Sequence, residues 1–432
     1  MNRKLVFAII ISASVTVGGF AQTGDSPEKS KRPRVIVTEN IPAAAPTPES
    51  TPRKVIVIPS ASPTNDARVQ PTPIPTNETQ SDTSQPAVFN PQARSLSYSE
   101  TQSKLEEAKR QMRTQPLRIS LSDEEQTTEI VRLAFYDWTN KKIDYAVISK
   151  TTFLGTDSDA VVRTENEQTV RIRTIRGNGV NTPVMIFDMY NRAHLPLIVQ
   201  YPIEKFGRFQ EMAYYVSTHP GIVTAENVSA GRTYLANVLD VAREKLREKG
   251  IFIQPKVVDI AERLALVEHV DHYRFRTEYH PKIYNDVYTL YALNQGQTYR
   301  YSVSSAGAGG MVQMIPSTYR MIRSRYYQVG LNPDFVSGMR DHQNAAQAML
   351  LYMQMTWNDL LSNSTVREAM DQGIATQEQL MAAGYNSNPA RLPGYIRRGG
   401  AGWTNLIPRE TKIYLQIFES VERYVPMAPR NR

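Results

Sequence analysis

The stretch Ser304–Tyr319, SSAGAGGMVQMIPSTY, joins a run of small residues to methionine, glutamine, isoleucine and proline. Glycine is used where the backbone needs torsion angles forbidden to other residues, or where another chain or a ligand must approach it closely. We therefore expect another group to lie against this backbone. The residues that follow predict a helix from Ser317 to Tyr326, with Met311 and Met314 packed in the core.

Three further segments around this stretch have helical patterns. ERLALVEHVDHYRF, Glu262–Phe275, predicts a short amphipathic helix with Glu268 near its end. LMAAGYNSNPARLPGYI, Leu380–Ile396, predicts a helix that ends at 384–386 before a proline-containing turn. PRETKIYLQIF, Pro408–Phe418, begins a helix with Glu410 in its first turn, where the helix dipole favours a carboxylate.

Together the four segments resemble the catalytic domain of the SLT-type lytic transglycosylases, relatives of goose-type lysozyme that cleave the glycan strands of peptidoglycan. The motifs of that family are a Glu-Ser ending a helix, S-x-x-G-A-x-G-L-M-Q-x-M-P-x-T, A-Y-N and E-T-x-x-Y. The matching residues here are Ser304, Gly307, Ala308, Gly310, Met311, Val312, Gln313, Pro316 and Thr318, then Ala383, Tyr385 and Asn386 with Gly384 inserted, then Glu410, Thr411 and Tyr414. The resemblance covers roughly Val258–Val425 and implies a mostly α-helical, lysozyme-like fold.

The resemblance also implies a substrate site that needs no cofactor and no metal. Its residues would be Ser304, Gly307, Ala308, Gly310, Met311 and Gln313 along a sugar cleft, with Tyr385, Asn386 and Glu410 beside them. Tyr385 would hydrogen-bond the catalytic glutamate and position it.

The position of the acid departs from the family. Counting back about twelve residues from Gly307, as the family spacing requires, leads to Gln295, which has no titratable proton to donate. If Asp271–Gln297 is instead an inserted segment, Glu268 is the acid, followed by His269 in place of the usual serine. Glu278 is the second choice, and a domain without a catalytic carboxylate is the third interpretation.

A single carboxylate suffices for the reaction that the resemblance implies, whereas ordinary glycosidases use two. The glutamate protonates the glycosidic oxygen and then deprotonates the muramyl 6-hydroxyl, which attacks the anomeric carbon and gives a 1,6-anhydro sugar. The acid must be protonated near neutral pH, so its pKa must be raised by an apolar surround. Leu264, Val267 and Met311 are the candidates for that surround.

Two other interpretations stay open. His269, Asp271, His272 and His280 lie near Glu268 in the sequence, and histidine with carboxylate can bind zinc, although no H-E-x-x-H motif is present. Alternatively the domain is a catalytically inactive peptidoglycan-binding or scaffold protein of the cell envelope, which Gln295 in the gapless register would favour.

The N-terminal part predicts export. Residues 1–21 have a basic start, an apolar run and small residues, the pattern of a cleaved secretory signal; an uncleaved membrane anchor is the alternative. Residues 22–116 are rich in Pro, Ser and Thr and predict a disordered linker. We expect the protein in the periplasm or cell envelope, in contact with the membrane only if the signal is retained.

A small α+β module of unknown role is expected at 117–232. A helix is expected to begin at Ser122 within LSDEEQTTEIVRLAFYDW, followed by strands at YAVIS, TVRIRTI, PVMIFDMY and LPLIVQYPI. A connecting helix at 233–250, the SLT-like domain at 251–425 and a tail at 426–432 complete the expected multidomain chain.

Composition restricts the chemistry and the partners. With 0 cysteines the chain has no disulfide and no thiol nucleophile, and its net charge of +8 favours anionic partners. For an exported chain these are peptidoglycan strands rather than nucleic acid, with other cell-envelope proteins as further partners of the linker or the middle module.

Overall fold

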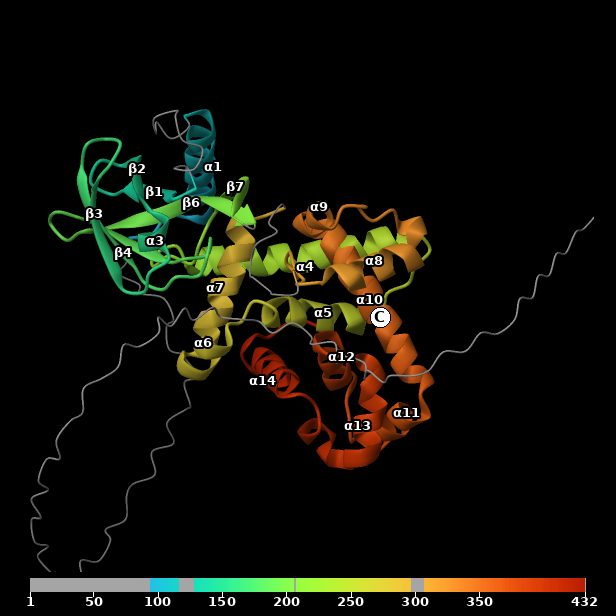
Figure 1. Cartoon of the computed structure of the whole chain (residues 1–432). Helices are drawn as coiled ribbons and strands as arrows, with labels where there is room; N and C mark the ends of the chain where they lie inside the picture. The colour runs from blue at the N-terminus through green and yellow to red at the C-terminus, as the bar shows by residue number, and fades with distance from the viewer. Residues whose placement is uncertain (1–93, 116–127, 206, 297–306, 432) are drawn as a thin grey trace, which may run out of the picture.

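The computed structural model describes residues 94–115, 128–205, 207–296 and 307–431. A curled antiparallel sheet occupies the middle of the chain, and the part after it is mostly helical (Figure 1). The predicted β-rich middle and helical C-terminal part are therefore confirmed. The predicted signal, most of the predicted linker and the helix start at Ser122 lie outside the described residues.

The strands are β1 (Ile130–Asp137), β2 (Lys142–Ser149), β3 (Ser158–Arg163), β4 (Thr169–Thr174), β5 (Val184–Asp188), β6 (Ala193–Lys205) and β7 (Arg208–Tyr215). The helices up to the glycine-rich stretch are α1 (Tyr98–Thr114), α3 (Lys150–Phe153), α4 (Ala225–Glu248), α5 (Pro255–Val267), α6 (His272–Thr277) and α7 (His280–Leu293). After it come α8 (Pro316–Arg325), α9 (Phe335–Arg340), α10 (His342–Ser362), α11 (Ser364–Asp371), α12 (Gln377–Asn386), α13 (Leu392–Gly399) and α14 (Arg409–Tyr424), with short 3-10 helices at Tyr327–Val329, Pro389–Arg391 and Gly400–Asn405.

The sheet has the strand order β2-β1-β6-β5-β4-β3, and β7 pairs with the second half of β6. All neighbouring strands are antiparallel. The sheet curls so that the chain after β3 returns to β2, where the Glu165 N–H donates to the Tyr145 carbonyl at 2.9 Å. The expected strands at YAVIS, TVRIRTI, PVMIFDMY and LPLIVQYPI are confirmed as β2, β4, β5 and β6.

The prediction of disorder is wrong for Tyr98–Thr114, which form helix α1. A capping box begins this helix, because the Ser97 side chain accepts from the Glu100 N–H and the Glu100 carboxylate accepts from the Ser97 N–H. Leu105, Ala108 and Met112 then bury one face in a cluster that includes residues of β6. The low-complexity tract before Ser97 obscured the helical spacing of these apolar residues in the sequence.

The predicted helix in LSDEEQTTEIVRLAFYDW is also wrong from Ile130 onward, because Ile130–Asp137 is the strand β1. β1 lies between β2 and β6 and is buried on both faces, so its residues do not alternate between apolar and polar. Leu133 and Phe135 pack into one hydrophobic cluster and Ala134 into another. A run of this kind cannot be told from a buried helix by its period alone.

The predicted connecting helix is longer than expected. α4 begins at Ala225, after the N-cap Thr224, and it contacts α5, α7 and α10 within the helical part. One hydrophobic cluster contains buried residues of every strand but β3 and of every helix from α4 to α14 but α6, so the core runs from the sheet into the helices without a boundary.

Asn294 attaches the end of α7 to Val216, the residue that follows β7. Its side-chain oxygen accepts from the Val216 N–H at 3.0 Å, and its side-chain NH₂ donates to the Val216 carbonyl at 2.9 Å. Figure 1 shows α7 between the sheet and the end of α5. In the described part of the chain, none of the helices has the length and apolar character needed to cross a bilayer.

Candidate functional site

Helix α5 carries Glu268 at its C-terminal end. The sequence predicted Glu268 near the end of a helix, but the single helix expected over Glu262–Phe275 is wrong, because α5 ends at Val267 and a separate helix, α6, begins at His272. Pro255 occupies the first turn, where its missing N–H costs nothing, and the helix ends at Val267 with Glu268 as the C-cap. α5 contacts α4, α10, α12 and α14 and lies in the middle of the helical part (Figure 1). This position brings Glu268 beside segments that are far apart in the sequence.

The Glu268 carboxyl group has an environment that favours its protonated form. Burial is the main cause and raises its pKa to about 8; the nearby charge of Glu410 also raises it. The Tyr414 hydroxyl donates a hydrogen bond to Glu268 Oε1 at 2.6 Å, which stabilises the carboxylate and opposes the rise. Glu268 therefore holds a proton at neutral pH and can donate it.

Glycine at position 310 is required by packing. The backbone at Gly310 has φ +69°, and a Cβ atom there would lie 2.2 Å from the Met339 carbonyl oxygen of α9. The close approach that the small residues predicted is thus made by α9. Gly307 and Ala308 are not fully buried and are available to line a cleft, whereas Ser304 lies outside the described residues.

The turn Gly310–Gln313 is held through two consecutive carbonyl groups. His269 Nε2 lies 2.9 Å from the Met311 oxygen, and the Tyr291 hydroxyl lies 3.2 Å from the same oxygen. The Tyr385 hydroxyl donates to the Val312 carbonyl at 2.7 Å. The predicted hydrogen bond from Tyr385 to Glu268 is therefore wrong for this structure, because the Tyr414 hydroxyl donates to Glu268 instead.

The turn, α12 and α14 meet beside Glu268. Tyr291 and Tyr385, whose hydroxyls contact the turn, both interact electrostatically with Glu268. The Asn386 side-chain oxygen accepts from the Thr411 hydroxyl at 2.9 Å, which joins the end of α12 to the first turn of α14. The predicted residues Glu268, Met311, Gln313, Tyr385, Asn386 and Glu410 are thus brought together in one region.

Glu278, the second choice for the acid, is tied into an ion cluster instead. Burial raises its pKa, but hydrogen bonds and charge attraction from Arg274, with a further contribution from Lys282, outweigh burial and lower the pKa to about 2. Its two carboxylate oxygens accept from Arg274 at 2.8 Å each. Glu278 is therefore ionised at neutral pH and unsuited to donate a proton.

Two of the three histidines considered as metal ligands, His269 and His280, have hydrogen-bond partners of their own. His280 contacts the Ser420 hydroxyl at 2.7 Å and the Phe275 carbonyl at 2.8 Å, and Asp271 caps α6 by accepting from the Arg274 N–H. Within the described ranges, no group of three or more histidine, aspartate or glutamate side chains is arranged to hold a metal ion.

Sequence reasoning missed the contacts of Tyr414, Tyr291 and His269. Tyr414 had a signal, because it follows Glu410 by one helical turn and so shares its face of α14. No sequence pattern indicated the contact of Tyr291, because the apolar residues of α7 are those that any packed helix would have. His269 stood out only as a departure from the family motif.

Replacing Tyr414 by phenylalanine is expected to raise the pKa of Glu268 above 8, because the lost hydrogen bond favours the charged form. Carboxyl ¹³C NMR of glutamate-labelled protein would measure this, with Glu268→Gln assigning the resonance. Tyr385→Phe is the matched control, because its hydroxyl bonds the Val312 carbonyl. An equal shift in both variants would contradict the assigned role of Tyr414.

The arrangement supplies one protonated carboxyl group, held by a tyrosine and flanked by a buried turn and a second carboxylate. It can deliver a proton to a leaving oxygen and take one back afterwards. Comparison with protein-family models, with curated proteins and with solved structures finds no match to this chain.

Proposed function

We propose that the protein is a peptidoglycan lytic transglycosylase that cleaves the bond between N-acetylmuramic acid and N-acetylglucosamine, and that residues 251–425 have a lysozyme-like fold. The observation that carries the proposal is the Glu268 carboxyl group, which accepts a hydrogen bond from the Tyr414 hydroxyl at 2.6 Å in surroundings that raise its pKa to about 8. It lies where the four motif segments meet.

In the proposed reaction the Glu268 carboxyl group donates its proton to the glycosidic oxygen, and the bond from that oxygen to the anomeric carbon breaks. The resulting carboxylate then takes the proton of the muramyl 6-hydroxyl. The 6-oxygen forms the new bond to the anomeric carbon of the same sugar, giving a 1,6-anhydro end. Glu268 is thereby protonated again, so one carboxyl group completes the cycle.

The remaining residues would bind and orient the sugar. Tyr414 holds the carboxylate formed in the first step, because its hydroxyl already donates to Glu268 Oε1. The partly exposed side chain of Gln313 and the exposed backbone at Gly307 are suited to contact the glycan. In this proposal the protein is exported and acts in the periplasm or cell envelope.

The test is mass spectrometry of the soluble products after incubating the full chain with isolated peptidoglycan, beside Glu268→Gln. Anhydro-muropeptides from the wild type alone are expected. Products with reducing ends would mean hydrolysis and contradict the proposed chemistry. Anhydro products from both proteins would place the acid elsewhere. If neither protein releases products while both sediment with peptidoglycan, the chain is a catalytically inactive peptidoglycan-binding protein. This is the alternative that Gln295 in the gapless register favours.

A further inference from the structure

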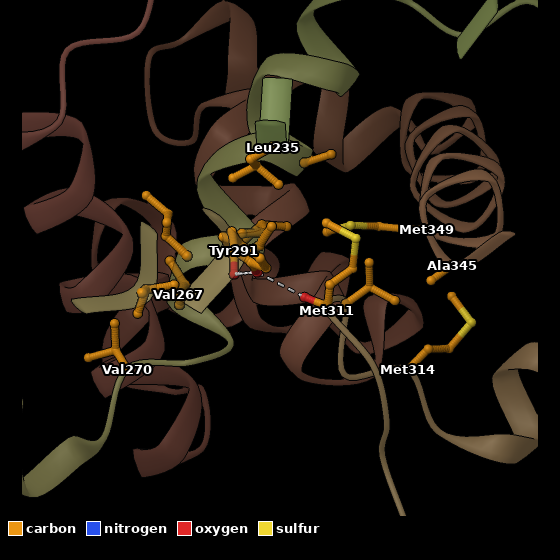
Figure 2. Packing of buried hydrophobic residues seen from close by; sticks show 14 of the residues in the cluster. Leu235, Val267, Val270, Tyr291, Met311, Met314, Ala345 and Met349 are labelled. Atoms are coloured by element: carbon orange, nitrogen blue, oxygen red, sulfur yellow. Dashed lines mark hydrogen bonds between the residues drawn. The ribbon is translucent and has the colours of Figure 1, made fainter. Parts of the chain in front are cut away.

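Helix α7 separates Glu268 from the glycine-rich stretch along the chain, yet it supplies a side chain to the site. The Tyr291 hydroxyl lies 2.6 Å from the Ala265 carbonyl on α5 and 3.2 Å from the Met311 carbonyl on the turn. Figure 2 shows Tyr291 pointing toward Met311 among buried apolar residues that include Val267. A hydroxyl has one hydrogen to donate, and the shorter distance assigns it chiefly to Ala265.

The main donor to the Met311 carbonyl is therefore His269. Its Nε2 lies 2.9 Å from that oxygen, and a carbonyl oxygen only accepts, so the ring carries its hydrogen on Nε2. Burial lowers the pKa of His269 to about 4, although the bond to Met311 opposes the shift. The ring is neutral at neutral pH and packs edge-on against Tyr291, with centroids 5.8 Å apart.

The turn has little freedom once its carbonyl groups are held. The peptide group between Met311 and Val312 is planar, so fixing the Met311 oxygen fixes the whole unit. The side chains of Met311 and Val312 are fully buried. The turn lies near Glu268, because the Tyr291 and Tyr385 hydroxyls hydrogen-bond its carbonyl groups and both tyrosines interact electrostatically with Glu268. The turn is therefore suited to form part of the buried surround of Glu268.

We propose that His269 is a positioning residue whose Nε2–H holds the Met311 carbonyl, fixing the turn Gly310–Gln313 beside Glu268 and shielding the carboxyl group from water. Tyr291 supports the same contact from α7. The effect on catalysis rests on the proposed function, whereas the effect on the Glu268 carboxyl group does not.

In the part of the chain that the structure describes, the titratable groups near Glu268 on the elements around it are few. They are His269 next to it in the sequence, Tyr291 on α7, Tyr385 on α12, and Tyr414 and Glu410 on α14. Burial raises the pKa of each tyrosine well above its usual value, so none of them loses its proton near neutral pH. The alkaline limb of the activity profile therefore reports Glu268.

The experiment compares His269→Leu with His269→Gln in the full chain. A glutamine amide can place an N–H near the position of Nε2, whereas leucine fills space without a donor. We expect His269→Leu to lower kcat about 30-fold with little change in KM, and to move the alkaline limb down by about one pH unit. In His269→Gln, both kcat and the position of the alkaline limb should be close to those of the wild type. Equal behaviour of the two variants would overturn the proposal.

A second readout does not need activity. Carboxyl ¹³C NMR should show the pKa of Glu268 lowered in His269→Leu and close to the wild-type value in His269→Gln. ¹⁵N spectra of the 6 histidines should show His269 neutral at pH 7 with its hydrogen on Nε2. An inactive wild type that passes both tests would refute the proposed function alone. A hydrogen on Nδ1, or an unchanged Glu268 pKa in His269→Leu, would refute the positioning role.

Discussion

Under the proposed function, replacing Glu268 by glutamine is expected to lower the rate of glycan release about 10³-fold, because glutamine cannot donate the proton that the leaving oxygen needs. The same change is expected to make the protein more stable at neutral pH. Glutamine has nearly the same shape as glutamate, and its oxygen can still accept from the Tyr414 hydroxyl. The loss of activity would therefore not come from a loss of structure.

The gain in stability follows from the raised pKa of Glu268. The folded protein keeps this proton up to a pKa of about 8, whereas the unfolded chain releases it near the ordinary value of 4.5. Between these values the unfolded state binds fewer protons, so the free energy of unfolding falls as pH rises. Glutamine does not titrate. We therefore expect the free energy of unfolding of Glu268→Gln to exceed that of the wild type by on the order of 2 kcal/mol at pH 7.5, allowing for the partial exposure of Glu268.

Urea unfolding of both proteins at about pH 4 and pH 7.5 measures this difference. The two proteins should have similar stability at the lower pH, where Glu268 is protonated in the folded and unfolded states alike. An equal difference at both pH values would show that the effect does not come from ionisation. Under the proposed function this loss of stability is expected, because an active site can need a group held in an unfavourable state.

Replacing Gly231 by alanine is expected to destabilise the protein by about 3 kcal/mol. Gly231 lies on α4, where an added Cβ atom would be 1.8 Å from the Tyr288 carbonyl oxygen of α7. Backbone cannot give way as a flexible side chain can, so α7 would have to move off α4. Because Tyr291 lies on the same helix, we also expect the contact with the Met311 carbonyl to lengthen and activity to fall.

Gly394→Ala is the matched control, because Gly394 also lies in a helix, α13, but has open space where its Cβ atom would be. There alanine should stabilise the protein by about 0.5–1 kcal/mol through its higher helix propensity. Thermal unfolding of the two variants measures whether Gly231→Ala is less stable and Gly394→Ala more stable than the wild type. A Gly231→Ala protein as stable as the wild type would contradict the close packing of α4 on α7.

The sequence by itself determined the local structure that presents the site. Caps, prolines and apolar periods predicted the helix that ends at Glu268, the helix that ends at Asn386 and the helix that begins before Glu410. It also predicted four of the strands. These features depend on neighbours within a few positions of each residue, so the sequence contains the information directly.

Only the tertiary structure decided the contacts within the site. It gave Glu268 the hydroxyl of Tyr414 instead of that of Tyr385, tied Glu278 to Arg274, and set His269 against the Met311 carbonyl. Hydrogen bonds between segments that are far apart in the sequence depend on distances of a few tenths of an ångström, which no local pattern specifies. The raised pKa of Glu268 has the same origin, because burial is a property of the assembled surroundings rather than of the residue.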